Sequence, residues 1–176
     1  TTIMSLESVL RELEKGRPGN DDRRDPEKYW LSVFGTPSAS RPWGWRLEGH
    51  HLSVNFCSVD GAVAAVTPLF LGASPAEIRS GPRAGQRVLA AEEDLARKLI
   101  LSLQDNHTEK SVMLTEAPGE VLTVPDASLD LGSPQGVSGK EMTASQQVLF
   151  QQVVEQVVRT LRGELADDVR VAMSGK

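Results

Sequence analysis

The sequence predicts an α+β fold, in which an antiparallel meander packs against two or three amphipathic helices. Apolar and other side chains alternate over Trp43–Leu47 and again over Leu52–Phe56, with the two-residue period of a half-buried strand. Asp60-Gly61 follows, a pair favoured in tight hairpin turns because both central positions need positive φ. In three other segments the apolar residues recur at helical spacing.

Size, charge and cysteine content narrow the class of protein. The 176 residues suffice for one domain, which we expect to span 1–176 with a flexible loop near 125–139. A formal charge of -5 without a basic block argues against nucleic acid as a partner. The apolar runs are much shorter than the roughly 20 residues that cross a bilayer, so no membrane partner is expected. A single cysteine, Cys57, excludes an intrachain disulfide and a cysteine-based zinc site.

The cellular compartment is inferred from the single cysteine and from the first residues of the chain. The first residues, Thr1-Thr2-Ile3-Met4, do not form a signal peptide. We therefore expect a soluble protein that is cytoplasmic or, if an export signal was removed, secreted.

The amino-terminal part begins with a predicted amphipathic helix over Ile3–Leu13, which should end at Gly16. The charged run Asn20–Pro26 predicts a loop with a solvated surface. Aromatic and branched residues over Tyr29–Phe34 predict a short strand, with a helix over Pro26–Phe34 as the alternative.

The middle of the chain contains the meander. A turn at Glu48-Gly49 separates the two alternating segments, and Ala62–Val66 supplies the third strand after the hairpin turn. Thr67–Ala73 is expected to continue at a sheet edge, where a proline does least harm. Gly81, Pro82 and Gly85 mark a loop.

The carboxy-terminal part is expected to be mixed. A second helix is predicted over Gln86–Leu103, with its exit at Gln104–His107. Further strands are predicted at Ser111–Thr115 and Val121–Val124. A long loop is expected over Pro125–Gly139.

The last predicted helix opens with Thr143 and Gln146, which have the spacing of a capping box. Its apolar residues continue to Leu161, and Gly163 offers a stop. Val169–Met173 fits either a last strand or a further helical turn.

One short segment concentrates the side chains that carry chemistry. Pro42–Phe56 holds two of the three tryptophans and two of the three histidines. Because histidine titrates near neutral pH and is a common metal ligand, His50 and His51 are the candidate catalytic and metal-binding residues. Adjacent side chains of a regular strand point to opposite faces, so both rings can reach one ion only across a bulge or turn. The alternative is a polar turn anchored by backbone hydrogen bonds.

Trp43, Trp45 and Asn55 are the candidate ligand-binding residues. The two indoles would wall a pocket and the amide would orient a polar group, whereas the alternative role of the indoles is packing. A divalent transition metal is the candidate cofactor, although the sequence does not select the further ligands that zinc sites need.

An ordered series of short motifs resembles a bacterial and fungal family known as domain of unknown function 3500. The motifs are Phe34-Gly35-Thr36-Pro37, Pro42-Trp43-Gly44-Trp45, Gly49-His50-His51-Leu52-Ser53, Thr67-Pro68-Leu69-Phe70-Leu71-Gly72-Ala73 and Glu92-Glu93-Asp94-Leu95-Ala96. The resemblance implies no established activity. It implies that members are longer, with a carboxy-terminal half rich in histidine, tyrosine and acidic residues, and that this chain is similar to the amino-terminal half of such a two-half architecture.

Two functions follow as hypotheses. The first is an enzyme acting on a small molecule by metal-assisted hydrolysis or oxidation, in which His50 or His51 binds metal or moves a proton. The second is a noncatalytic ligand-binding or assembly module that completes its site with another chain, as a homo-oligomer or with a second protein. Stoichiometric metal would favour the first, and concentration-dependent association without metal would favour the second.

Overall fold

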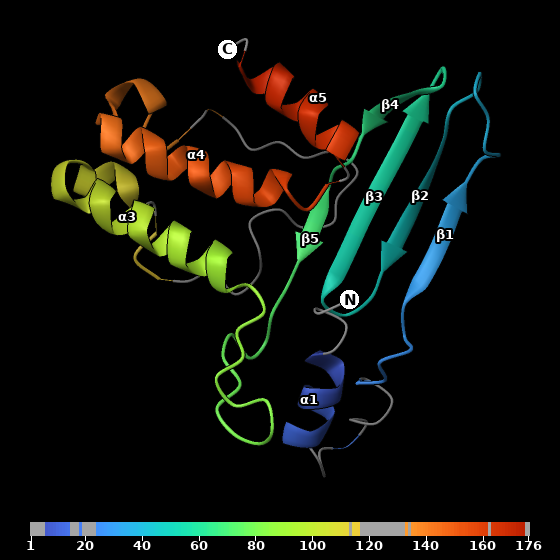
Figure 1. The fold of residues 1–176 in the computed structure, drawn as a ribbon, viewed down its shortest axis with the longest axis horizontal. Helices are drawn as coiled ribbons and strands as arrows, with labels where there is room; N and C mark the ends of the chain where they lie inside the picture. Colours follow the sequence, from blue (N-terminus) through green and yellow to red (C-terminus); the bar gives the residue numbers. More distant parts are fainter. Residues whose placement is uncertain are drawn as a thin grey trace. The chain divides into compact units, whose positions relative to one another are not determined.

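The computed structural model of the chain describes residues 6–14, 18, 24–112, 114–116, 133, 135–161 and 163–174. The chain divides into two compact units, Thr1–Ala90 and Ala91–Lys176. The described residues contain a five-stranded antiparallel sheet and four α-helices, which confirms the α+β fold class (Figure 1). The expectation of a single domain stays a prediction.

The sheet belongs entirely to the first unit. Its strands are β1 (Trp30–Phe34), β2 (Trp43–Glu48), β3 (Leu52–Val59), β4 (Ala62–Ala65) and β5 (Leu69–Leu71). The first four lie side by side in chain order, and β5 pairs with the beginning of β3. This confirms the meander, the strand alternative for β1 and the strand expected within Thr67–Ala73.

The strand register separates an apolar face from a more polar one. Val33 lies opposite Trp45, and Trp45 lies opposite Phe56, so these three side chains share a face. On the other face Arg46 lies opposite Asn55. The side-chain alternation predicted from the sequence is therefore confirmed, because directly opposed residues of paired strands point the same way.

The hairpin between β3 and β4 is formed by Asp60 and Gly61, with φ of 51° and 77°. Both values lie in the left-handed region that the predicted turn requires. A Cβ at Gly61 would also come within 2.6 Å of the Ala39 carbonyl oxygen. This turn makes β3 and β4 antiparallel neighbours, with Val59 opposite Ala62.

The core of the first unit lies beside α1 (Leu6–Leu13) rather than within the sheet. Leu6 and Val9 of this helix pack against Ile78, and all three are buried. The loop that presents Ile78 is closed by two backbone hydrogen bonds, from Ile78 to Gln86 (3.0 Å) and from Gly85 to Ile78 (2.7 Å). The helix and the 73–88 segment therefore stabilise each other.

The second unit is helical in its described residues. Its elements are α3 (Ala90–Ser111), the short 3₁₀ helix η1 (Gly139–Glu141), α4 (Ala144–Val158) and α5 (Gly163–Ser174). Thr143 and Gln146 form the predicted capping box at the start of α4. The buried Gln146 amide also donates to the Ser102 carbonyl oxygen at 2.7 Å, which joins α4 to α3. Among the described residues, none of the helices combines the length and apolar character that crossing a bilayer needs.

The bounds of α3 differ from the prediction. It begins at Ala90 because Gln86 is held in the preceding loop, where it donates to the Arg83 carbonyl oxygen and accepts from Ile78. It continues through a kink at His107, with φ of -136° and ψ of 38°, to Ser111.

Contacts with η1 explain why the helix does not stop at the predicted exit. His107 Nε2 donates to the Glu141 carbonyl oxygen at 3.0 Å, and Lys110 forms an ion pair with the Glu141 carboxylate. The strand predicted at Ser111–Thr115 is therefore wrong where the chain is described, because Ser111 ends α3 and residues 112 and 114–116 form no strand.

The remaining predictions fall at the carboxy-terminal end. The strand predicted at Val121–Val124 lies outside the described residues, as does most of the loop near 125–139. Gly163 does not act as a stop but is the first residue of α5, and the tail takes the helical alternative.

Candidate functional site

His50 and His51 lie in the turn between β2 and β3. The Gly49 amide donates to the Leu52 carbonyl oxygen at 2.8 Å and closes this turn. The two imidazole rings meet edge to face, with centroids 4.6 Å apart and planes at 86°. His50 is exposed, whereas His51 is only 8% exposed. The structure thus brings the two histidines together by means of a turn.

The His51 ring is held where it cannot easily be charged. The backbone carbonyl oxygen of His51 accepts a hydrogen bond from the Gly72 amide at 2.8 Å. A Cβ at Gly72 would lie 3.2 Å from His51 Nδ1, so the glycine leaves room for the ring. Burial lowers the pKa of His51 below its ordinary value, and His50 and Arg24 lower this pKa further by charge repulsion. The ring is therefore neutral near pH 7.

A buried ion-pair system lies beside it. Arg24, 6% exposed, donates from Nε and Nη2 to both carboxylate oxygens of Glu14 at 3.0 and 3.2 Å. Its Nη1 lies 3.9 Å from Oε2 of Glu7, a residue of α1 that is 1% exposed. The expectation of a solvated surface over Asn20–Pro26 is therefore wrong for Arg24, because two carboxylates fix its guanidinium in the interior.

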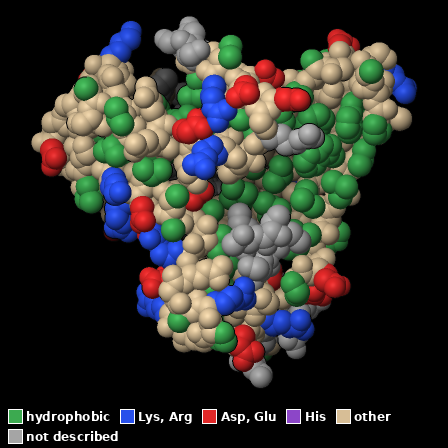
Figure 2. Space-filling model, in the orientation of Figure 1, with side chains coloured by type: hydrophobic (Ala, Val, Ile, Leu, Met, Phe, Trp, Pro, Cys, Tyr) green, Lys and Arg blue, Asp and Glu red, His purple; other side chains and the backbone are tan. Residues whose placement is uncertain are grey.

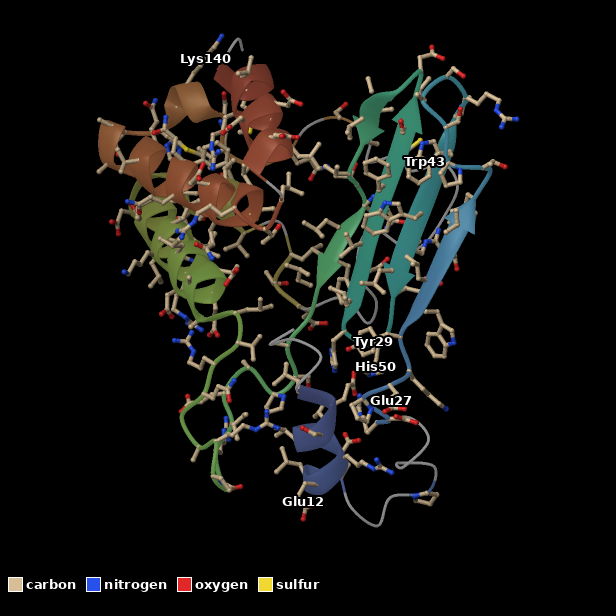
Figure 3. All side chains as sticks on the ribbon, turned by 45° about the vertical axis from the view of Figure 1, so that its right-hand side comes forward. Glu12, Glu27, Tyr29, Trp43, His50 and Lys140 are labelled. Carbon is tan, nitrogen blue, oxygen red and sulfur yellow. The ribbon has the colours of Figure 1, made fainter. Side chains whose placement is uncertain are left out.

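Tyr29 completes the group from the residue just before β1. Its ring lies against Gly49, where a Cβ would come within 2.4 Å of two ring carbons. Burial raises the pKa of Tyr29, and the nearby negative charge of Glu7 raises this pKa further. The hydroxyl therefore keeps its proton. Figure 3 places Tyr29 and His50 together at the end of the sheet nearest α1.

These side chains leave several polar atoms unsatisfied. In the described part of the chain, the buried side-chain atoms without a hydrogen-bond partner are Glu7 Oε1 and Oε2, Arg24 Nη1, Tyr29 Oη and His51 Nε2. Every one belongs to the same group, which we call the polar cluster: Glu7, Arg24, Tyr29 and His51. Native interiors leave few such atoms. Tyr29 and Glu7 lie close enough to interact with each other, and buried water satisfies such polar groups in many proteins.

The candidate ligand-binding residues lie elsewhere. Trp43, Trp45 and Asn55 all line a groove of about 550 Å³ along the sheet. Trp45 stacks on Phe56, with centroids 5.6 Å apart and planes at 14°. Arg46 Nε donates to Asn55 Oδ1 at 3.0 Å. Trp43 and Trp45 both contact Phe56 on one face of the sheet, whereas the Asn55 side chain lies with Arg46 on the opposite face. The structure thus brings the two indoles together but not Asn55, and we call the surface of the indoles the aromatic groove.

The aromatic groove and the histidine turn lie at different places along the sheet. Trp43 begins β2, whereas His50 follows the end of that strand. Figure 3 shows Trp43 toward one end of the sheet and His50 at the other. Figure 2 shows hydrophobic side chains gathered in the region of the sheet. The indoles therefore do not wall a pocket around the histidines.

Metal binding by His50 and His51 stays a prediction. A structural or catalytic zinc ion takes at least three protein ligands. Within the described ranges, no three side chains of histidine, cysteine, aspartate or glutamate gather closely enough to hold an ion. Proton transfer needs no such set, so the geometry supports acid–base chemistry at this turn more directly.

Sequence reasoning missed three members of the polar cluster. Glu7 had a local signal, because it lies on the apolar stripe of its helix, three residues before Leu10 and next to Leu6. A charge on an apolar stripe is expected to find a buried partner. Arg24 and Tyr29 had no comparable signal, since one lies in a charged run and the other beside a strand.

Comparisons with known proteins give one result. Neither the curated proteins nor the solved structures contain a match to this chain. A family model, described as protein of unknown function (DUF3500), matches residues 1–174 of the 176. The chain therefore belongs to this family, as the ordered motifs from Phe34 to Ala96 suggest.

Proposed function

We propose that this protein is an enzyme that acts on a small polar molecule by general acid–base chemistry at the polar cluster. The observation that carries the proposal is the neutral, buried His51, whose Nε2 has no partner in the described structure and lies among other unpartnered groups. Groups with shifted pKa values and unused hydrogen-bonding capacity are typical of catalytic sites.

The roles follow from the protonation states. Neutral His51 can take a proton from water, and protonated Tyr29 can donate a hydrogen bond. Arg24 Nη1 is the remaining cationic donor, because its other two nitrogens are occupied by Glu14. Glu7 offers two acceptor oxygens to a donor group of the substrate.

Hydrolysis of an ester or amide uses His51, Arg24 and Tyr29. Water adds to the substrate carbonyl carbon while its proton passes to His51 Nε2, and negative charge develops on the carbonyl oxygen. Arg24 and Tyr29 stabilise that oxygen by donating hydrogen bonds. Collapse of the intermediate expels the leaving group, which takes the proton from His51.

His50 links this chemistry to solvent. Its ring is exposed and touches the buried His51 ring edge to face. In our proposal it exchanges protons with water and limits access to the cluster. Replacement of His50 should therefore lower the rate less than replacement of His51.

A hydrolysis screen tests the proposal. The protein is assayed against chromogenic esters, anilides, phosphates and glycosides, beside His51→Gln, Tyr29→Phe and a control, His107→Gln. We expect hydrolysis of an ester or anilide, a fall of roughly 100-fold or more in folded His51→Gln, and no change in the control, whose histidine lies in the other unit. Absence of turnover on the whole panel, or full activity in folded His51→Gln, would contradict the proposal.

The metal-assisted form of this enzyme has a separate test. Elemental analysis of protein purified without an affinity tag or chelator is compared with the His50→Ala/His51→Ala double variant. Near one equivalent of a divalent transition metal, lost in a folded variant, would support a metal at the pair. Absence of metal from both proteins would contradict the metal form and leave the acid–base proposal in place.

The aromatic groove favours a second function, a noncatalytic ligand-binding module. Its volume of about 550 Å³ lies within the range of small-molecule sites. The aromatic lining suits a ligand with a flat apolar face.

Fluorescence titration tests this function, with benzoate as a probe for aromatic ligands and glucose as a probe for sugars. Binding that is lost in Trp45→Phe and kept in Trp30→Phe would support it, because Trp30 does not line the groove. A signal that depends equally on both residues, or no signal, would contradict it.

A further inference from the structure

In the part of the chain that the structure describes, β1 is an uncovered edge of the sheet. It stands at one end of the strand order, and within the described residues it pairs only with β2 (Figure 1). Trp30 is 56% exposed, Leu31 65%, Val33 52% and Phe34 52%. The apolar residues of this strand therefore face solvent on both sides of the sheet.

Nothing in the sequence of β1 protects this edge. Natural edge strands usually carry a charge, a proline or a bulge that prevents pairing with another chain. Trp30-Leu31-Ser32-Val33-Phe34 has no charge and no proline. Its register with β2 is regular over all five residues. Such a strand is a template for one more strand.

The strand is complementary to itself. Around Ser32 its side chains read aromatic, aliphatic, serine, aliphatic, aromatic. We propose that β1 pairs antiparallel with β1 of a second copy of this chain, about a two-fold axis at Ser32. In this register Leu31 lies opposite Val33 of the second copy, and Trp30 lies opposite its Phe34.

Backbone geometry permits this register. In this register even-numbered residues lie opposite even-numbered residues, and odd-numbered residues lie opposite odd-numbered ones. The residues whose amide and carbonyl groups point away from β2 therefore lie opposite each other and can form hydrogen bonds, whichever set they belong to. A two-fold axis perpendicular to the sheet keeps the faces aligned. Leu31 and Val33, on the face that carries Trp45, would therefore join two apolar faces into one.

Charge also favours a second copy. The first charged residues beyond the strand are Lys28 and Glu27. In the same register, if the pairing direction continues, they lie opposite Thr36 and Pro37 of the second copy. No like charges face each other, although the chain carries a net charge of -5. A single strand pair is smaller than the roughly 1,600 Å² of a standard interface, so the dimer should dissociate on dilution.

Disulfide trapping tests the register. Ser32→Cys is made in a Cys57→Ser background, so that one thiol remains per chain. Directly opposed residues of antiparallel strands have Cα atoms about 4.5 to 5.5 Å apart, within the roughly 4.4 to 6.8 Å that a disulfide needs. The control is Phe34→Cys in the same background, because two copies of residue 34 would be four residues out of register, about 13 Å apart.

We expect a covalent dimer of the Ser32→Cys protein on a nonreducing gel after mild oxidation, and little or none from Phe34→Cys. Equal cross-linking of both variants, or none of Ser32→Cys, would overturn the proposed register.

Charge reversal at the axis tests the dimer without a covalent bond. Sedimentation velocity should show that the unmodified protein dimerises with concentration, that Ser32→Asp and Ser32→Lys are each monomeric, and that their mixture dimerises. Val63→Asp, on β4, is the matched control and should still dimerise. An unmodified protein that stays monomeric at its highest soluble concentration, or a dimer broken by Val63→Asp and kept by Ser32→Asp, would overturn the proposal.

Discussion

Replacing Arg24 with leucine should destabilise the sheet unit strongly. The guanidinium is buried and lies between Glu7 and Glu14. Without it, Glu14 can turn toward water because its side chain is 20% exposed, but Glu7 cannot because its side chain is 1% exposed. The variant therefore leaves one carboxylate buried without a cation, which is costly in a low-dielectric interior.

The expected magnitude follows from this asymmetry. Removing one partner of a buried ion pair typically costs about 3 to 5 kcal/mol, against a total stability of about 5 to 15 kcal/mol for a domain. Glu7→Leu should cost much less than Arg24→Leu, because Arg24 keeps both hydrogen bonds to Glu14. The double variant Arg24→Leu/Glu7→Leu should recover part of the loss, since no charge is then stranded.

Urea unfolding followed by tryptophan fluorescence measures these changes in the correct unit, because Trp30, Trp43 and Trp45 all lie in β1 and β2. Arg97→Leu on an exposed face of α3 is the control and should leave this transition unchanged. The reasoning is refuted if Arg24→Leu costs less than about 1 kcal/mol, or if the double variant is less stable than Arg24→Leu alone.

Three other predictions concern both units. Because the pKa of His51 is lowered in the folded state, the unfolded chain binds a proton more readily than the folded chain. The stability should therefore fall as the pH drops below about 6.5. Urea titrations at several pH values measure this slope, and His51→Gln should flatten it. Gly49→Ala should cost about 1 to 3 kcal/mol in urea unfolding by displacing the Tyr29 ring; an unchanged midpoint would refute the packing. Thr143→Ala should cost about 1 kcal/mol of helical stability, measured by circular dichroism; Gln146→Ala should cost more, because its buried amide also binds α3.

Features set by local periodicity were predictable. The alternation that ends at Phe56, the Asp60-Gly61 turn and the Thr143 cap each depend on residues a few positions apart, and each is present. The end of α3 was not predictable, because it depends on contacts of His107 and Lys110 with a segment about 30 residues away.

The candidate site was only partly predictable. The sequence placed His50 and His51 in one site, which needs a bulge or a turn at that point if both rings are to meet, and the structure has a turn there. It also grouped the histidines with Trp43, which lies at the far end of β2. A strand rises about 3.4 Å per residue, so residues close in the sequence can lie far apart along it. The six residues of β2 therefore separate the indole from the turn by well over 15 Å, roughly the length of the strand.

The polar cluster required tertiary structure. Glu7, Arg24, Tyr29 and His51 come from α1, the segment after it, the residue before β1 and the turn before β3. No spacing in the sequence relates these four positions. Burial of Arg24 was hidden for the same reason, because the carboxylates that fix it lie 10 and 17 residues earlier.

The protonation state of His51 tests the acid–base proposal most directly. The chain has three histidines, so their ring signals in nuclear magnetic resonance spectra can be assigned with His50→Gln, His51→Gln and His107→Gln. A titration from about pH 4 to 9 then gives the pKa of each ring. We predict that His51 titrates below 6.5 and is neutral near pH 7. A His51 pKa above 7 would mean that the ring is mostly charged near pH 7 and would contradict its role as the base.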